Sequence, residues 1–310
     1  MSGRVRVLVT ERIVDAGMAV LRHPQVEVVG PLASPEELPD AIRDVDGLLV
    51  RTMRIPGDLI RSAPRLKVIA KHGVGTDNID RQACEERGVK VTVTADANKE
   101  TVAEFVLGLF IAVARHLVAA DAAVRAGRFS DRDRLMGREW MGKTIGIVGY
   151  GRIGQALAPR LVGGLKARVL VYDPYWPAGA VLPPEARRVD AVETLLEASD
   201  GVTVHVPLGP ETYHLLNRER IARMRPQSYL VNAARGGVVD GAALYEALRS
   251  GHLAGAALDV FDPEPPRADD PLLSLPNVVL APHLAATTAE AMERMARAAA
   301  TSILQVLGVA

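Results

Sequence analysis

The chain has 310 residues, enough for about two domains that each bury a hydrophobic core. Lysine and arginine together number 37, as do aspartate and glutamate, so no net charge is expected to recruit nucleic acid or an anionic membrane. A single cysteine, Cys84, excludes an internal disulfide framework, and no Cys/His cluster has zinc-site spacing, so we expect no metal.

Short β-branched runs alternate with helical patterns from the beginning of the chain, which is typical of parallel α/β proteins. In the first hundred residues we predict strands at 5–9, 26–29, 48–50, 67–70 and 90–93, with helices between them, for example at 11–21. Strand-like sequence so early leaves no room for a signal peptide, and no apolar run is long enough to span a bilayer. We therefore expect a cytoplasmic protein.

Residues 99–126 have the apolar spacing of one long helix, with Val102, Val106, Leu109 and Val113 on one face. This helix is expected to join the two halves of the chain. A polar stretch rich in arginine and aspartate follows at 128–138 and is expected to lie on the surface.

The second half of the chain again alternates strand and helix patterns. We predict six strands, the number expected of a dinucleotide-binding sheet, at 144–148, 168–172, 202–206, 229–232, 256–260 and 278–281. A final helix is predicted at 287–306, with Thr287 or Thr288 as its N-cap.

A glycine-rich loop separates the first two of these strands. It reads Gly149-Tyr150-Gly151-Arg152-Ile153-Gly154 and leads into a helical pattern. The first glycine permits a tight turn, the second lets the backbone approach a pyrophosphate, and the third lets the helix pack close to the strand. The following strand ends at Asp173, about 20 residues later, where an acid would bind a ribose 2′-hydroxyl. This combination predicts a dinucleotide-binding domain.

Three later strands each lead to a polar side chain: Arg235 before two glycines, Glu264 between two prolines, and His283 after Pro282. Open α/β sheets bind ligands at the carboxyl ends of their strands, which is where these side chains fall. The planar guanidinium of Arg235 suits a carboxylate held at two points. The flanking prolines stiffen the loop that carries Glu264. Each residue taken alone also has a structural reading, as a hydrogen-bonded side chain at a strand end.

These stretches, together with the first-domain motifs Lys71-His-Gly-Val-Gly-Thr-Asp-Asn-Ile-Asp and Asn98-Lys-Glu-Thr-Val-Ala-Glu, resemble the D-2-hydroxyacid dehydrogenase family over nearly the whole chain. Within the family the chain is most similar to short-type 3-phosphoglycerate dehydrogenases. The resemblance implies an α/β fold of two doubly wound domains. A Rossmann NAD-binding domain, residues 99–284, is inserted in a flavodoxin-like substrate domain formed by residues 1–98 and 285–310. It also implies a cleft with hinges near Asn98 and Leu284, and a homodimer interface formed by the long helix and the loop to Lys143.

By the same resemblance the catalytic residues are Arg235, Glu264 and His283. Oxidation of a 2-hydroxy acid removes a hydroxyl proton while a hydride leaves C2. An imidazole titrates near operating pH, so His283 can take that proton and return it in reduction. Glu264 would stabilise the imidazolium and raise its pKa, while Arg235 would hold the substrate carboxylate and polarise the carbonyl.

The resemblance further implies NAD as cofactor and assigns binding residues one by one. The cofactor set comprises Gly149, Gly151, Arg152, Ile153, Gly154, Asp173, Thr101, His205, Val206, Pro207, Thr212, Ala233 and Asp259, with Asp259 at the carboxamide. The substrate set comprises Arg51, Lys71, Gly73, Val74, Gly75 and Arg235. Arg51 and Lys71 match positions that face the phosphate in phosphoglycerate dehydrogenases. An alternative for Arg51 is a solvent-exposed charged side chain at the end of a strand, with no ligand.

Two positions depart from the family's pattern. Ala285 replaces a glycine that is common two residues after the histidine, which is expected to tighten the nicotinamide site. Trp140 stands where leucine is usual, and the sequence offers no functional account of it.

The predicted function is NAD-dependent oxidation of a D-2-hydroxy acid, including 3-phosphoglycerate, or the reverse reduction of a 2-keto acid. A hydroxypyruvate or glyoxylate reductase is the alternative enzyme. An NAD-sensing regulator, as in corepressors of this fold, is the alternative from another class. A formate dehydrogenase is disfavoured because those enzymes carry glutamine where Glu264 stands. The sequence does not identify the substrate. The shape of the substrate pocket depends on residues of both domains. Arg132, Arg134 and Arg138 are candidates for that pocket, but their positions cannot be fixed from the sequence.

Overall fold

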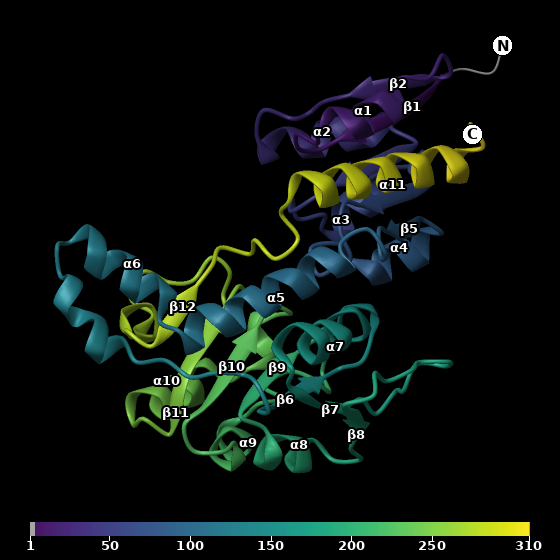
Figure 1. Ribbon diagram of the computed structural model, residues 1–310. Coiled ribbons are helices and arrows are strands. Elements are labelled where there is room, and N and C mark those ends of the chain that lie inside the picture. Colours follow the sequence, from purple (N-terminus) through teal and green to yellow (C-terminus); the bar gives the residue numbers. More distant parts are fainter. Residues whose placement is uncertain (1–3, 310) are drawn as a thin grey trace. The chain divides into compact units, whose positions relative to one another are not determined.

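The computed structural model describes residues 4–309, and the chain divides into two compact units (Figure 1). The first unit contains the chain up to Asn98 and again from Ala286 onward, and the second contains Lys99–Ala285. The second unit ends one residue beyond the predicted boundary, because the backbone N–H of Ala285 donates to the carboxylate of Asp259 within that unit.

The first unit is built on a five-stranded parallel sheet with the strand order β2-β1-β3-β4-β5. Its strands are β1 (Val5–Val9), β2 (Val26–Val29), β3 (Gly47–Val50), β4 (Val68–Lys71) and β5 (Lys90–Val93). Its helices are α1 (Asp15–Leu21), α2 (Leu38–Ala41), α3 (Gly57–Ser62), α4 (Arg81–Arg87) and α11 (Ala289–Leu307). This order is the flavodoxin-like one, so the predicted fold of this unit is confirmed.

Side chains of successive strand residues point to opposite faces of the sheet, and each face has its own core. Val7 and Val9 pack in the cluster that contains Ile303 of α11, whereas Leu8 packs in the cluster that contains Ile60 of α3. The chain that returns after the second unit therefore completes the core of the first unit.

Two boundaries in this unit differ from the prediction for a local reason. Helix α1 begins at Asp15 rather than at residue 11, because the carboxylate of Glu11 accepts the N–H groups of Arg51 and Thr52 and holds its own segment as a loop. Helix α11 begins after Thr288, whose hydroxyl accepts the N–H of Ala291, so Thr288 is the N-cap of the two candidates.

The second unit is built on a seven-stranded parallel sheet with the order β12-β11-β10-β9-β6-β7-β8. Its strands are β6 (Thr144–Val148), β7 (Arg168–Tyr172), β8 (Ala186–Arg188), β9 (Gly201–Val204), β10 (Ser228–Asn232), β11 (Leu253–Leu258) and β12 (Val278–Leu280). Its helices are α5 (Lys99–Ala114), α6 (Leu117–Arg125), α7 (Arg152–Leu165), α8 (Val192–Ala198), α9 (Arg218–Arg223) and α10 (Gly241–Arg249). The predicted count of six strands was wrong, because β8 is a three-residue edge strand with two exposed arginines and no apolar pattern.

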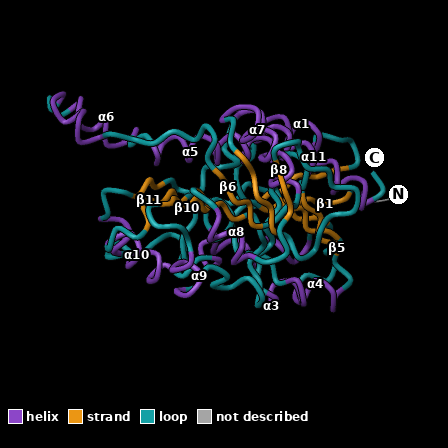
Figure 2. The backbone as a smooth tube through the Cα atoms, turned by 60° about the horizontal axis from the view of Figure 1, so that its bottom comes forward, coloured by secondary structure: helices purple, strands orange, loops and turns teal. Residues whose placement is uncertain are grey.

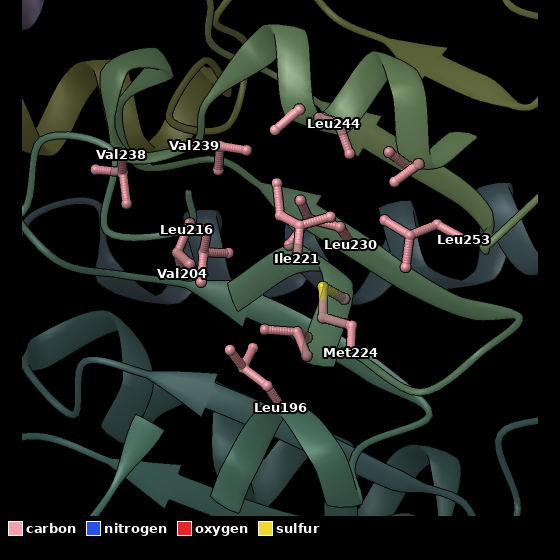
Figure 3. Packing of buried hydrophobic residues seen from close by; sticks show 14 of the residues in the cluster. Leu196, Val204, Leu216, Ile221, Met224, Leu230, Val238, Val239, Leu244 and Leu253 are labelled. Carbon is pink, nitrogen blue, oxygen red and sulfur yellow. The ribbon is translucent and has the colours of Figure 1, made fainter. Parts of the chain in front are cut away.

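One face of this sheet packs against α8, α9 and α10 through a cluster of leucine, valine, isoleucine and methionine side chains. Figure 3 shows Leu196 of α8, Ile221 of α9 and Leu244 of α10 directed toward Leu230 of β10. This packing fixes the strands whose carboxyl ends carry the candidate site.

The single long helix predicted at 99–126 was also wrong, because the helix breaks after α5. His116 has a left-handed φ of 50°, and α5 and α6 meet at an angle of 61°. Figure 2 shows α6 extending away from the strands of its own unit. Among the described residues no single helix is long and apolar enough to cross a bilayer, and the α5–α6 pair reaches that length only as a bent pair.

Trp140 has a structural role in this unit. Its indole N–H donates to the carbonyl of Phe110 at 3.0 Å, and its ring meets Phe110 and Tyr229 edge-on. A Cβ atom on Gly201 would lie 2.7 Å from the Trp140 ring. The tryptophan therefore fills the space between α5 and the amino ends of β9 and β10.

Candidate active site

The strands of the second unit are all parallel, so the loops that follow them share one edge of the sheet. Every residue predicted to be catalytic, and most of those predicted to bind the cofactor, follows one of these strands. The glycine loop follows β6, and the loops that carry Arg235, Glu264 and His283 follow β10, β11 and β12.

The three glycines of the glycine loop are required for different reasons. Gly149 has a φ of 96°, and a Cβ atom there would lie 2.8 Å from the carbonyl of His205. A Cβ atom on Gly154 would lie 2.4 Å from the carbonyl oxygen of Gly149, so this glycine allows α7 to pack against the turn. A Cβ atom on Gly151 would meet no protein atom within 4 Å. Gly151 is therefore not needed for packing, and its bare backbone at the start of α7 fits the close approach of a pyrophosphate.

The acid at the end of β7 is held beside this loop. Asp173 accepts the N–H of Tyr150 on one carboxylate oxygen at 2.7 Å and the N–H of Tyr175 on the other at 2.8 Å. A carboxylate has about four acceptor positions, so about two remain for the hydroxyls of a ribose. The binding of a ribose by Asp173 stays a prediction, and these two hydrogen bonds leave acceptor positions for it.

Three aromatic residues to which the sequence assigned no role organise this region. Tyr150, inside the glycine loop, is buried, stacks on Trp176 with ring centroids 4.9 Å apart, and donates its hydroxyl to the carbonyl of Val181. The hydroxyl of Tyr175 donates to Glu211 at 2.7 Å and so links the loop after β7 to the loop after β9. An aromatic residue within the glycine loop was the only sequence signal for this arrangement.

The loop after β9 contains the residues predicted to wall the adenine. His205 is partly exposed, yet desolvation of its ring lowers its pKa to about 4, and its Nε2 lies 3.1 Å from the hydroxyl of Thr203. Thr212 donates its hydroxyl to the carbonyl of Pro207 and accepts the N–H of Gly209. These contacts hold the loop in shape, and a cofactor contact of Thr212 remains a prediction.

The Arg235 loop after β10 is shaped by its neighbours. Asn232 bonds through its side chain to the carbonyl of Arg235 and the N–H of Ala234. Gly236 lies against the loop after β11, because a Cβ atom on it would fall 2.0 Å from the backbone of Phe261. Only glycine allows this approach, which brings the loop of Arg235 to the loop of Glu264.

Glu264 and His283 form a hydrogen-bonded pair. The Oε1 atom of Glu264 lies 2.6 Å from Nδ1 of His283, and both side chains are about half exposed. The hydrogen bond that His283 donates to Glu264 is the main cause that raises the pKa of His283, against the opposing effects of burial and of Arg235. The same bond lowers the pKa of the Glu264 carboxyl. The pair therefore favours imidazolium beside carboxylate, with Nε2 as the ring nitrogen that Glu264 does not use.

Asp259, predicted to contact the nicotinamide carboxamide, is fully buried. Its carboxylate accepts the N–H groups of Leu284 at 2.7 Å and Ala285 at 2.9 Å. Burial is the largest influence on this carboxyl and raises its pKa. Its described partners are thus backbone groups next to His283.

The residues predicted to bind the substrate from the first unit also have protein partners. Arg51 donates from Nη1 to the carbonyl of Arg12 at 2.9 Å. Lys71 donates to the side chain of Asn78 at 2.8 Å and to the carbonyl of Arg51. Gly73 has a φ of 135° and donates its N–H to Thr94.

The remaining predicted residues are Val74 and Gly75 after β4, Thr101 in the first turn of α5, Ile153 in α7, Val206 after β9, and Ala233 after β10. Val74 is exposed, whereas Thr101 and Ala233 are buried. Among residues 4–309 no group of three or more His, Cys, Asp and Glu side chains is placed to hold a metal ion.

Comparison with known proteins identifies relatives over most of the chain. The family profile described as D-isomer specific 2-hydroxyacid dehydrogenase, NAD binding domain, matches residues 107–285. A glyoxylate reductase of Thermofilum pendens is 44% identical over 98% of this chain and 92% of its own length. A D-3-phosphoglycerate dehydrogenase of Methanocaldococcus jannaschii is 42% identical over 98% of this chain, which spans only 57% of that relative. The crystal structure of the TT0316 protein from Thermus thermophilus has a TM-score of 0.89 and 40% identity, covering 98% of this chain and 97% of its own.

Proposed function

The chain belongs to the D-isomer specific 2-hydroxyacid dehydrogenase family, and from that premise we propose that it interconverts a D-2-hydroxy acid and a 2-keto acid with NAD. The observation that carries the proposal is the 2.6 Å hydrogen bond between Nδ1 of His283 and Glu264. The loop that carries Glu264 also packs against the loop of Arg235, through Gly236 and Phe261. A proton-transfer group and a carboxylate-binding cation are what the reaction requires.

In the reduction direction His283 is the general acid. Its Nε2 gives a proton to the carbonyl oxygen of the keto acid, and in oxidation it takes the proton of the hydroxyl. Glu264 fixes the tautomer through Nδ1 and stabilises the imidazolium. Arg235 holds the substrate carboxylate and stabilises the charge that develops on the oxygen. The NAD cofactor, when bound, supplies or accepts the hydride.

NAD is held, in this proposal, by the glycine loop and the acid of β7. The backbone at Gly151 and the first turn of α7 receive the pyrophosphate, and Asp173 receives the ribose hydroxyls. The open space beside Gly151 and the fixed carboxylate of Asp173 support this assignment.

A small, unphosphorylated 2-keto acid such as glyoxylate or hydroxypyruvate is the substrate we propose. The basis is that Arg51 and Lys71, the cations expected at a phosphate, bond to the carbonyl of Arg12 and the side chain of Asn78. A phosphorylated substrate is the second candidate, because the relative from Methanocaldococcus jannaschii is named D-3-phosphoglycerate dehydrogenase.

We also propose that the chain acts as a cytoplasmic homodimer. Exposed apolar side chains gather on α6 and on the segment after it, where they are available to be buried by a second copy: Leu117, Val118, Val124, Phe129, Met136 and Met141. Burial of such a surface is the usual driving force for association.

Steady-state oxidation of NADH with glyoxylate, hydroxypyruvate, pyruvate and 3-phosphohydroxypyruvate tests the function. We expect kcat/KM to be higher for the first two acids than for the phosphorylated one. His283→Ala should lower kcat by about 10²–10⁴-fold without weakening NADH binding. Tight NADH binding with no turnover of any acid would contradict the proposal and favour an NAD-sensing regulator.

A further inference from the structure

The loop that joins β7 to β8, residues 174–185, contains no helix or strand. It begins directly after Asp173, the acid proposed to bind the ribose of NAD, and it contains four prolines and one glycine. Holding an irregular segment of this length in one conformation costs conformational entropy. Contacts from other parts of the chain are therefore needed to give this loop a fixed shape.

The side chain of Tyr150, in the glycine loop, makes the first of these contacts. It is 1% exposed, and its hydroxyl donates to the carbonyl of Val181 at 3.0 Å. Within residues 4–309 this is the one hydrogen bond that ties the segment 176–181 to a residue outside the loop. The Val181 side chain is itself 80% exposed, so its own packing does little to hold the segment.

The Tyr150 ring makes a second contact with the same loop. It stacks on the Trp176 ring, with an interplanar angle of 16° and ring centroids 4.9 Å apart. The guanidinium of Arg188, on β8, lies over the same Trp176 ring at 4.8 Å. The loop is therefore fastened to the glycine loop at two positions, Trp176 and Val181.

Tyr150 and the loop after β7 also share the carboxylate of Asp173. One oxygen accepts the backbone N–H of Tyr150 at 2.7 Å, and the other accepts that of Tyr175 at 2.8 Å. Tyr175 belongs to the loop, so a movement of the loop would move one of the two partners of Asp173. The position of the loop thus affects the orientation of the acid.

The Tyr150 hydroxyl is suited to a permanent hydrogen bond. Burial raises the pKa of the phenol, so it stays protonated and keeps its donor across neutral pH. Phenylalanine would fill nearly the same space and keep the ring stack, but it has no donor for the Val181 carbonyl. Substitution at position 150 can therefore remove the hydrogen bond and the stack one at a time.

We infer that Tyr150 is a positioning residue for the adenosine half of the cofactor, because its side chain holds residues 174–185 against the glycine loop before the cofactor binds. The inference rests on the proposed placement of NAD at the glycine loop and Asp173. Tyr150 was not among the residues that the sequence assigned to the cofactor. A site that is already ordered binds more tightly, because binding does not have to select a rare open or closed form of the loop.

The test is the binding of NADH and of ADP-ribose, a probe that lacks the nicotinamide, to Tyr150→Phe and Tyr150→Leu. In Tyr150→Phe the dissociation constants of both ligands should rise by about 3–10-fold, the size of one lost hydrogen bond. In Tyr150→Leu, which also loses the ring stack, they should rise by about 10–100-fold. The kcat at saturating NADH should stay within about twofold of wild type, because only binding is affected.

Tyr229→Phe is the matched control. Tyr229 is also buried, but it lies near the start of β10, at the edge of the sheet opposite the glycine loop, and its ring contacts Trp140. This variant should leave both dissociation constants unchanged. A Tyr150→Phe protein with wild-type dissociation constants would overturn the inference. A fall in kcat with unchanged binding would also overturn it, because Tyr150 would then act on the reacting groups.

Amide hydrogen exchange of the cofactor-free protein keeps the inference testable if the Tyr150 variants do not fold. The N–H of Ala180 donates to the carbonyl of Pro177 within the loop at 3.1 Å. Its exchange should be slow in wild type and about 3–10-fold faster in Tyr150→Phe. Rapid exchange in wild type would mean that the loop is not held, and would overturn the inference.

The failure of this inference can be distinguished from the failure of the proposed function. A wild-type protein that binds neither NADH nor ADP-ribose would refute the proposed function, whatever the exchange rate of the Ala180 amide. A protein that binds both ligands equally well with and without the Tyr150 hydroxyl would refute this inference alone.

Discussion

Glu264 and His283 change one another's protonation in opposite directions. The carboxylate raises the pKa of the imidazole, and the imidazole lowers the pKa of the carboxyl. A raised pKa keeps His283 protonated to higher pH, which is the form that a general acid requires. The same effect moves formation of the neutral base that oxidation requires to higher pH, so the pair extends activity in the reduction direction to higher pH.

Glu264→Gln should shift the pH dependence of this enzyme. The amide keeps a hydrogen bond to Nδ1 but lacks the charge that stabilises imidazolium, so the pKa of His283 falls. Activity in the reduction direction should then decline at lower pH than in wild type. The measurement is kcat/KM for the keto acid against pH. Glu193→Gln is the control, because it removes the carboxylate partner of Arg220 elsewhere in the unit and should leave the pH profile unchanged. An unshifted pH profile in Glu264→Gln would contradict the role of Glu264 as the group that raises the pKa of His283.

Asp173 should determine the choice of cofactor. Because Tyr150 and Tyr175 hold its carboxylate, Asp173 cannot swing away from a 2′-phosphate. Juxtaposed like charges cost several kcal/mol, and roughly 3–4 kcal/mol corresponds to about 10²–10³ in kcat/KM in favour of NAD. Arg188, a base on the neighbouring strand β8, lies over the Trp176 ring at 4.8 Å.

The measurement is kcat/KM with NAD and NADP for wild type, Asp173→Ala and Asp173→Asn. Asp173→Ala should reduce the preference mainly by weakening NAD. Asp173→Asn, which keeps an acceptor but removes the charge, should reduce it mainly by improving NADP. A wild-type ratio near one would exclude the ribose-binding role of Asp173.

At the scale of elements, the site depends on two loops that touch through one glycine. The 3₁₀ turn Gly236–Val238 follows β10, and the Glu264 loop follows β11. A Cβ atom at Gly236 would lie 2.0 Å from the carbonyl carbon and oxygen of Phe261, closer than any real contact. One of the two loops must therefore move if position 236 has a side chain.

Gly236→Ala should separate Arg235 from the Glu264–His283 pair. We expect kcat to fall by about 10²-fold, as for other small displacements of reacting groups, together with a lower Tm. Gly163→Ala is the control. This glycine lies inside α7, and an added Cβ atom would meet nothing within 4 Å. Alanine at this position should therefore leave the stability of the protein unchanged or raise it. A Gly236→Ala enzyme with wild-type kcat would mean that the contact does not align the site.

At the scale of the whole molecule, the proposed dimer depends on the apolar surface of α6 and the segment after it. Phe129→Asp combined with Met136→Lys places charges on side chains that are 70% and 82% exposed. If a second copy buries them, the variant should sediment as a monomer at micromolar concentration. Val181→Asp changes another exposed apolar residue and should remain a dimer. A wild-type protein that sediments as a monomer would contradict the proposal.

The sequence by itself determined what depends on neighbours along the chain. Alternating apolar runs predicted the parallel sheets, and the spacing of Gly149, Gly151 and Gly154 before Asp173 predicted the dinucleotide-binding turn. Arg235, Glu264 and His283 were identified because each follows a strand, and parallel strands bring their carboxyl ends together. These features require only local propensity and a general rule of sheet topology.

Only the tertiary structure decided features that depend on contacts between distant residues. The apolar pattern continues through His116, so nothing local marks the break between α5 and α6. The edge strand β8 exists because β7 offers a free edge, not because Ala186–Arg188 has strand character. The partners of Arg51, Lys71 and Asp259 belong to other segments or to backbone groups, which side-chain type cannot reveal. Residue type sets which chemistry is possible, but the partner of a charged group is chosen by the three-dimensional path of the chain.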